Sequence, residues 1–187
     1  MKKAFKICIL SFFSFSVCSF CTKEDEKNQL AQQAKSINDF IIRDTSDAKK
    51  INRDTVITVT NKRETNRIVW NPCLGDTIAP GDTVTFAYIA RIFSSGKGAM
   101  FATNLSELVD TGVWSISVYP DDYGKNAAGI GNYVRGLDAG LVGMCAGEYA
   151  YIIFTSQYGY GNKELSIIPR MSPLMFEVEI EHIIKKK

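Results

Sequence analysis

The sequence predicts an α+β fold, in which an antiparallel β-sheet wraps around one short helix and a short N-terminal helix precedes the sheet. The first observation is that several segments alternate apolar and polar residues with the period of two that marks a half-buried strand. The second is a single glycine-rich helical segment that lies between the second and third of the strand segments. Strands and helices do not alternate along the chain, so a parallel βαβ arrangement is not expected.

The first residues predict export. Residues 1–6 are basic and residues 7–20 are an apolar run, the pattern of a signal peptide that is short for a permanent membrane span. Cys21 follows, so the segment resembles a bacterial lipoprotein signal in which Cys21 carries the lipid. Phe20 stands where that motif has a small residue, so a secretory signal without lipidation is the alternative. The expected location is the outer membrane, facing the periplasm or the cell surface.

Three parts follow from this: a signal peptide at 1–20, a lipid-anchor helix with a linker at 21–55, and the main domain at 56–187. Residues 24–42 predict an amphipathic helix, whose stripe packs on the domain or on a second copy of the chain, the domain being favoured. The stripe consists of Leu30, Ala34, Ile37 and Ile41. Residues 43–55 are polar and aperiodic, which predicts the linker.

The main domain begins its strand pattern at 82–92, where alternate residues are apolar. A second strand is predicted at 114–118, and the almost wholly apolar run 149–154 predicts a short central strand. In 174–182 the apolar residues alternate with Glu177, Glu179 and Glu181, which we expect to face water. His182 ends this strand and is expected to be partly buried.

The one helical segment of the domain spans residues 132–144. Its apolar face consists of Val134, Leu137, Leu141 and Met144. Its glycines each cost up to about 1 kcal/mol relative to alanine in a helix, so only tertiary packing can hold it.

Several motifs follow one another in a fixed order over residues 81–184. They are Gly81 to Tyr88, Gly96-Lys97 with Phe101, Tyr133 to Leu141, Gly147, Tyr158 to Gly161, Ile167 to Pro169 and Leu174 to Ile180. This order resembles the FK506-binding-protein (FKBP) type of peptidyl-prolyl isomerase. The resemblance implies the fold described above and an activity on proline-containing peptides or unfolded envelope proteins.

The same resemblance implies a set of site residues. The walls of the site would be Tyr88, Phe101, Val134, Leu137, Tyr160, Ile168 and Phe176, with Trp114 and Ile167 as further binding residues. The Tyr160 hydroxyl and the Val134 amide would donate hydrogen bonds to the substrate. Rotation about a prolyl bond needs no acid, base or metal, so no cofactor and no metal is implied.

Two positions depart from the family pattern. Ala102 stands after Phe101 where active members carry Asp, and Leu137 replaces the usual Trp. We therefore expect low isomerase activity, with a non-enzymatic FKBP-fold lipoprotein that binds peptides or proteins as the alternative. The oligomeric state is left open.

The composition excludes other classes of function. Removal of the signal takes away three lysines and no acid, so the net charge falls from +2 to 2 − 3 = −1, and no basic surface for nucleic acid is expected. His182 is the single histidine and no nucleophile elbow or complete glycine fingerprint occurs, which argues against a Ser-His-Asp triad or a nucleotide site. In the mature chain Cys73 and Cys145 either pair or remain buried thiols.

Overall fold

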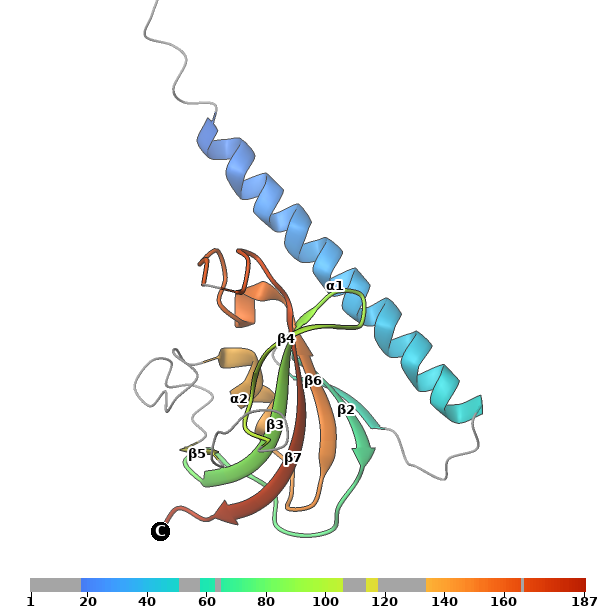
Figure 1. The fold of residues 1–187 in the computed structure, drawn as a ribbon, viewed down its shortest axis with the longest axis vertical. Coiled ribbons are helices and arrows are strands. Elements are labelled where there is room, and N and C mark those ends of the chain that lie inside the picture. The colour runs from blue at the N-terminus through green and yellow to red at the C-terminus, as the bar shows by residue number, and fades with distance from the viewer. Residues whose placement is uncertain (1–17, 51–57, 63–64, 106–113, 118–133, 166) are drawn as a thin grey trace, which may run out of the picture.

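The computed structural model describes residues 18–50, 58–62, 65–105, 114–117, 134–165 and 167–187. In chain order the elements in Figure 1 are α1 (Cys18–Lys50), β1 (Thr58–Lys62), β2 (Thr65–Asn71), β3 (Thr83–Phe93), β4 (Lys97–Thr103), β5 (Trp114–Ser117), α2 (Arg135–Leu141), β6 (Tyr149–Phe154), the 3₁₀ turn η1 (Ser156–Tyr158) and β7 (Leu174–Ile184). Nearly all of the predicted signal peptide and residues 51–55 of the predicted linker lie outside these residues.

The strands form a 7-stranded sheet in the order β1-β2-β6-β7-β3-β4, with β5 paired to β3. Every pairing is antiparallel. The predicted α+β class is therefore confirmed, and the predicted strands correspond to β3, β5, β6 and β7. Strands β1, β2 and β4 were not predicted from the sequence. In β2 both Ile68 and Val69 are buried, because the sheet is covered on both faces there, and this removes the period-two signal.

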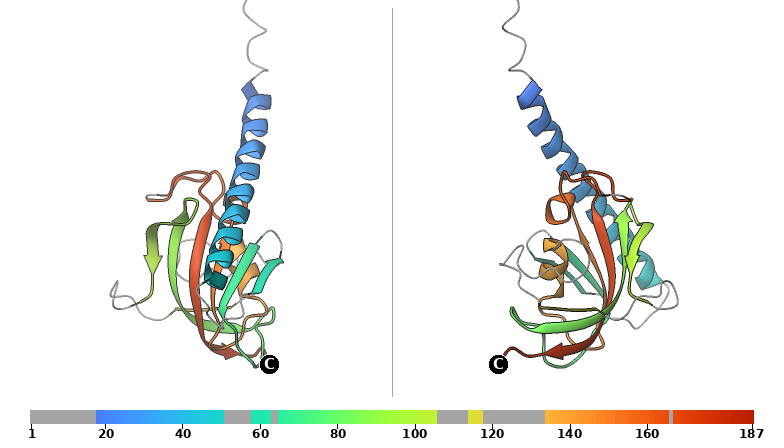
Figure 2. Two further views of the ribbon diagram at one scale, coloured as in Figure 1. Left: turned by 90° about the vertical axis from the view of Figure 1, so that its right-hand side faces the viewer. Right: turned by 60° about the vertical axis from the view of Figure 1, so that its left-hand side comes forward.

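The helix α2 covers the inner face of the sheet, and two glycines allow it to approach β6 closely (Figure 2). A Cβ at Gly136 would lie 2.2 Å from the ring of Phe154, and one at Gly140 would lie 2.3 Å from Ile152. Tertiary packing thus requires the glycines that weaken the helix in isolation, a requirement that the sequence pattern did not predict.

The helix α2 ends earlier than predicted. Its helical residues stop at Leu141, and Gly143 then adopts a left-handed φ of 84° in the turn that follows. A glycine in this conformation terminates a helix, so the apolar spacing that continues to Met144 does not continue the helix. Met144 is nevertheless fully buried against the inner core.

The helix α1 lies across the outer face of the sheet. Its residues Ile37, Phe40 and Ile41 form a second buried cluster with residues of the sheet, and the rings of Phe40 and Phe93 meet edge-on at 5.4 Å. The sheet residues of this cluster are Ile68, Phe93, Ile153 and Met175. Of the two alternatives for the helix, packing on the domain is the one that the structure shows.

Two details of the α1 prediction are wrong. Ala34 is exposed, and Gln33 takes the buried position instead. The helix also continues to Lys50, so residues 43–50 are not a linker. The hydroxyl of Thr45 donates to the carbonyl of Ile41, and that of Ser46 to the carbonyl of Arg43, so these polar residues are accommodated within the helix.

The N-terminal part of α1 extends beyond the sheet (Figure 1), and residues 23–29 are exposed. Across the described residues, none of the helices has both the length and the apolar character needed to traverse a bilayer.

The strand β7 departs from the predicted alternation at two places. Glu177 is only 6% exposed, not water-facing, because Arg91 and Lys97 cover it. Further along, Phe86 pairs with Ile180 but Thr85 pairs with His182, so Glu181 is an extra residue in a β-bulge. The bulge shifts the alternation by one residue, so His182 is exposed, not partly buried, since the inward position passes to Ile183.

Candidate functional site

The structure brings the seven predicted wall residues together in one hydrophobic cluster between the sheet and α2. Six of them are buried and Phe101 is half-buried at the edge. They come from β3 (Tyr88), β4 (Phe101), the start of α2 (Val134, Leu137), the β6–β7 connection (Tyr160, Ile168) and β7 (Phe176). The side chain of Trp114 lies outside the described residues, although its backbone pairs with Phe86. Ile167 is exposed by 61%.

Phe176 is the centre of the aromatic contacts. Phe101 meets it edge-on at a centroid distance of 6.1 Å, Phe154 stacks on it at 5.9 Å, and Tyr88 lies at 6.3 Å. Phe176 itself is fully buried. These rings form a rigid apolar core at this point, and the half-buried Phe101 brings it to the edge of the cluster.

A β-bulge in β4 places Phe101 and Ala102 against the same cluster. Neighbours in a regular strand point to opposite faces, yet both residues pack on the inner core. Ala102 pairs with Ala90 and Met100 pairs with Arg91, which leaves Phe101 as the extra residue. Position 102 is therefore half-buried beside Phe101, and the alanine supplies only a methyl group there.

Two polar residues that were not predicted from the sequence hold Tyr88 in place. The hydroxyl of Thr103 donates to the Tyr88 carbonyl at 2.7 Å, and the Tyr88 amide donates to Oδ1 of Asn104 at 2.8 Å. Both residues are buried at the end of β4. No signal in the sequence marked these two residues, because their burial depends on how β4 pairs with β3. Once buried, their polar side chains need partners.

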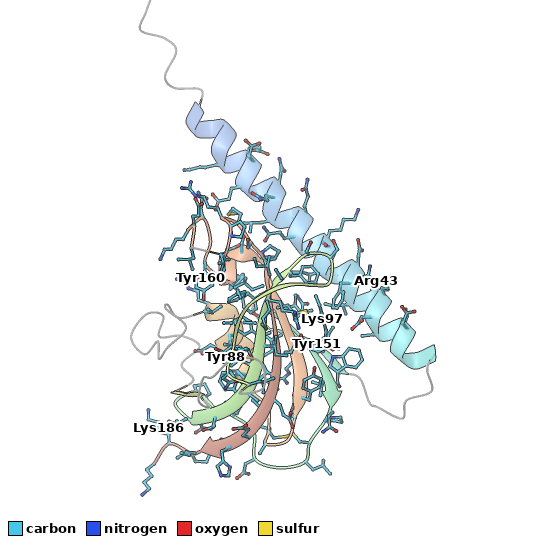
Figure 3. The ribbon with its side chains drawn as sticks, in the orientation of Figure 1. Arg43, Tyr88, Lys97, Tyr151, Tyr160 and Lys186 are labelled. Carbon is cyan, nitrogen blue, oxygen red and sulfur yellow. A yellow bond between two sulfur atoms is a disulfide. The ribbon has the colours of Figure 1, made fainter. Side chains whose placement is uncertain are left out.

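The tyrosine hydroxyls of the cluster are protonated near neutral pH. Burial, aided by the neighbouring Tyr160, raises the pKa of Tyr88 to about 12. Burial also raises the pKa of Tyr160. Figure 3 shows both tyrosines on the α2 side of the sheet, whereas Lys97 and Tyr151 lie on the side of α1. The cluster can therefore offer neutral hydrogen-bond donors in apolar surroundings.

The β6–β7 connection folds back on itself through backbone hydrogen bonds. The amide of Gly161 donates to the carbonyl of Ser156 at 2.8 Å, and the amide of Met171 donates to the carbonyl of Gly161 at 2.9 Å. Leu165 and Ile168 exchange two backbone bonds, of 2.7 and 3.1 Å, so the chain turns tightly between them. This turn directs Ile168 into the cluster and leaves Ile167 exposed.

Arg67 of β2, also missed in the sequence, fixes the C-terminal end of α2. Its Nη1 donates to the carbonyls of Gly140 at 2.9 Å and Val142 at 3.1 Å, as expected of a cation at the negative end of a helix. Its Nε lies 3.7 Å from Oε1 of Glu148.

At the N-terminal end of α2, Val134 is the N-cap residue, so its own N–H takes no part in the hydrogen bonds within the helix. This placement is compatible with its predicted donor role.

Cys73 and Cys145 form a disulfide, which decides between the two alternatives left open by the sequence. The bond ties the β2–β3 connection to the segment after α2, where the carboxylate of Glu148 accepts from the Cys145 amide at 3.3 Å. The two sulfurs and this carboxylate lie within 4.8 Å of one another. Metal binding requires thiolates, so an intact disulfide excludes this group as a metal site.

Comparisons with known proteins agree with this arrangement. FK506-binding protein 2 of Aspergillus fumigatus is 35% identical over 72 residues, which cover 36% of this chain and 54% of that protein. The chain thus spans about half the length of this relative. A peptidyl-prolyl cis-trans isomerase of Schizosaccharomyces pombe is 31% identical over 109 residues, 58% of this chain and 83% of that protein.

Among solved structures, the N-terminal domain of FKBP42 from Arabidopsis thaliana has a TM-score of 0.55 at 17% identity, covering 71% of this chain and 95% of that chain. At this identity the likeness concerns the fold alone. The sequence model of the FKBP-type peptidyl-prolyl cis-trans isomerases matches residues 75–181, which is more than half of the chain and includes all seven wall residues. The chain therefore belongs to the family of FKBP-type peptidyl-prolyl cis-trans isomerases.

Proposed function

We propose that this protein is a peptidyl-prolyl cis-trans isomerase of low activity that assists protein folding in the bacterial cell envelope. One observation carries the isomerase proposal: the residues at the family's motif positions lie in a single buried cluster with protonated tyrosine hydroxyls. Its substrates would be proline-containing peptides or unfolded envelope proteins.

The chemistry suits a site without an acid, a base or a metal. Rotating a peptide bond costs about 18–20 kcal/mol, because resonance is lost in the twisted form. The twisted bond has a smaller charge separation than the planar one, so apolar surroundings favour it. In this proposal Phe101 and Phe176 hold the proline ring, while the Tyr160 hydroxyl and the Val134 amide orient the flanking carbonyls.

The low activity is proposed from positions 102 and 137. Ala102 lies beside Phe101 at the edge of the cluster, where a carboxylate could reach a bound peptide, and its methyl group cannot. Leu137 is 4% exposed and offers less aromatic area than the Trp of the family pattern. Ring burial depends on apolar area and shape, so weak activity is expected to survive.

A protease-coupled isomerisation assay on a series of proline tetrapeptides tests this function. We expect the wild type to exceed the uncatalysed rate weakly, and Ala102→Asp to exceed the wild type. Both proteins must first unfold near the same denaturant midpoint, because a destabilised site would mimic lost chemistry. If both are folded and neither exceeds the uncatalysed rate, the isomerase proposal is wrong.

A non-enzymatic binding module is the second candidate, and Ala102 is the observation that favours it. The same apolar cluster would then bind a proline segment without accelerating its isomerisation. Titration of the inactive protein with a proline peptide, followed through the fluorescence of its aromatic residues, would support this candidate if binding saturates and Phe176→Ala weakens it.

Anchoring through Cys21 is the proposed basis of the envelope location. Its support is the apolar run 7–20 directly before this cysteine. Metabolic labelling with a fatty acid should mark the wild type and not Cys21→Ser. Equal labelling of the two proteins would place the lipid elsewhere and contradict the proposed site.

A further inference from the structure

Gln33 is a buried polar residue on the face of α1 that meets the sheet. It is 8% exposed, whereas glutamine is mostly a surface residue. Its Oε1 accepts from the Ser156 amide at 2.9 Å, and its Nε2 donates to the Met171 carbonyl at 2.7 Å. Only a side chain with both an acceptor and a donor can satisfy these two backbone groups at once.

Ser156 and Met171 delimit the connection that carries site residues. Ser156 begins η1 and is separated from the end of β6 by Thr155, and Met171 lies shortly before β7. Between them lie Tyr160, Ile167 and Ile168. Gln33 therefore joins the two ends of this connection to each other and to α1, and its contacts lie outside the wall residues themselves.

The helix also holds the other segment that leads to the site. Arg43 Nη2 donates to the carbonyl of Ser95 at 2.7 Å, and the hydroxyls of Ser36 and Ser95 lie 3.2 Å apart. Ser95 is in the turn between β3 and β4, and β4 carries Phe101 and Ala102. The helix α1 thus contacts both segments from the face of the sheet opposite to the cluster.

Backbone strain occurs at these same two contacts. In the described part of the chain, positive φ values in residues other than glycine occur at Ser95 (57°) and Met171 (56°). Such residues adopt this conformation at a cost, and surrounding contacts must hold it. In each case the carbonyl of the strained residue accepts a hydrogen bond from α1, from Arg43 at Ser95 and from Gln33 at Met171.

We propose that α1 is a strut that sets the geometry of the site, and that Gln33 is the positioning residue through which it acts on the β6–β7 connection. The effect on catalysis rests on the isomerase function proposed above. Without the Gln33 amide, the Ser156 N–H and the Met171 carbonyl lose their partners. The connection then leaves its strained conformation more often, and the Tyr160 hydroxyl is less well placed for a bound peptide.

The test uses two substitutions and a matched control in the full chain. Gln33→Met keeps the length and helix propensity of the side chain and removes both hydrogen bonds, while Gln33→Glu keeps an acceptor for Ser156 and loses the donor to Met171. Gln29→Met makes the same change at an exposed position of α1. Variants are compared only if their denaturant unfolding midpoints are close to that of the wild type.

The first measurement is amide hydrogen exchange, which does not depend on activity. We expect the amides of Ser156, Gly161 and Met171 to exchange about tenfold faster or more in Gln33→Met. In Gln33→Glu the exchange rate of the Ser156 amide should lie between those of the wild type and Gln33→Met. In Gln29→Met the exchange rates should equal those of the wild type. Unchanged protection of these three amides in folded Gln33→Met overturns the proposal, whether or not the wild type is an isomerase.

The second measurement is the isomerisation rate, split into kcat and KM. A positioning role predicts that Gln33→Met lowers kcat severalfold with a smaller change in KM, and that Gln33→Glu recovers part of the loss. If the exchange changes but an active wild type and Gln33→Met have equal kcat, the strut does not act on the site and the proposal fails. An inactive wild type with faster exchange in Gln33→Met refutes the proposed function and leaves the structural role of Gln33 supported.

Discussion

The side-chain amide of Asn104 substitutes for a neighbouring strand at Tyr88. On this edge of β3, β4 pairs from Ile89 onward and β5 pairs up to Phe86, so a gap remains between them. Asn104 fills it: Oδ1 accepts from the Tyr88 amide and Nδ2 donates to the Phe86 carbonyl, both at 2.8 Å. The Asn104 side chain thus satisfies backbone groups of Tyr88 and Phe86 on this edge, while β7 pairs with both residues on the opposite edge.

Asn104→Ala should lower the free energy of unfolding by about 2–4 kcal/mol, because two buried backbone groups lose their partners. Asn104→Asp keeps the acceptor and loses the donor, so its free energy of unfolding should lie between those of the wild type and Asn104→Ala. Denaturant unfolding measures both, with Asn162→Ala at an exposed position as the control. If Asn104→Ala loses no more free energy of unfolding than the control, the two hydrogen bonds of Asn104 do not stabilise this edge of β3.

Tyr160→Phe should lower kcat/KM about three- to tenfold, the effect of removing one oriented hydrogen bond to the substrate. Tyr151→Phe makes the same chemical change on the opposite face of the sheet and should leave the rate unaltered. Because burial raises the pKa values of Tyr88 and Tyr160, the wild-type rate should also be flat between about pH 6 and 9. Equal rates for Tyr160→Phe and the wild type would exclude this hydroxyl as the donor.

Gly136→Ala should destabilise the protein by about 1–3 kcal/mol, although alanine favours helices. The added Cβ would lie 2.2 Å from the ring of Phe154, which is fully buried and cannot move aside freely. Gly75→Ala is the control, since a Cβ there meets no atom within 4 Å. Thermal or denaturant unfolding of the two variants decides the matter, and a neutral Gly136→Ala would mean that α2 can move away from β6.

Glu177→Gln should be less stable than the wild type by about 1–2 kcal/mol at neutral pH, because it weakens the bonds to Arg91 and Lys97. Burial opposes ionisation of Glu177, but the bonds from these cations outweigh it and hold its pKa below the usual 4.5. A carboxyl group whose pKa is lower in the folded than in the unfolded protein stabilises the fold fully at pH values above the unfolded pKa. This contribution decreases as the pH falls below that value.

The difference between wild type and Glu177→Gln should therefore be constant above about pH 5.5 and shrink below pH 4.5. Unfolding curves from pH 3 to 7 measure it. A difference that stays constant down to pH 3 would contradict the assigned ion pairs.

The double variant Cys73→Ser, Cys145→Ser should lose about 2–4 kcal/mol, since the disulfide closes a long loop with a sequence separation of 72. A reductant should move the unfolding midpoint of the wild type toward that of the double variant and leave the double variant unchanged. If reduction of the denatured wild type does not alter its midpoint, the cysteines are not paired in the folded protein.

The local pattern of the sequence determined the fold class and four of the strands, and the order of its motifs predicted the wall residues. Apolar alternation in β3 and β7 depends only on residues near one another in the chain, and so does the order of the motifs that carry Tyr88, Val134 and Tyr160. These features can be read from the sequence, because a strand that buries one face shows the same alternation whichever strands pair with it.

Only the tertiary structure decided how the site is supported. The bulge at Phe101 depends on the register of β4 against β3, and the burial of Glu177 depends on cations from two other strands. The helix α1 shows the same limit, since its stripe predicted a helix but gave no sign that Gln33 would be buried. Gln33 and Met171 are separated by 138 residues, so their hydrogen bond exists only once the sheet has formed and α1 has packed across it.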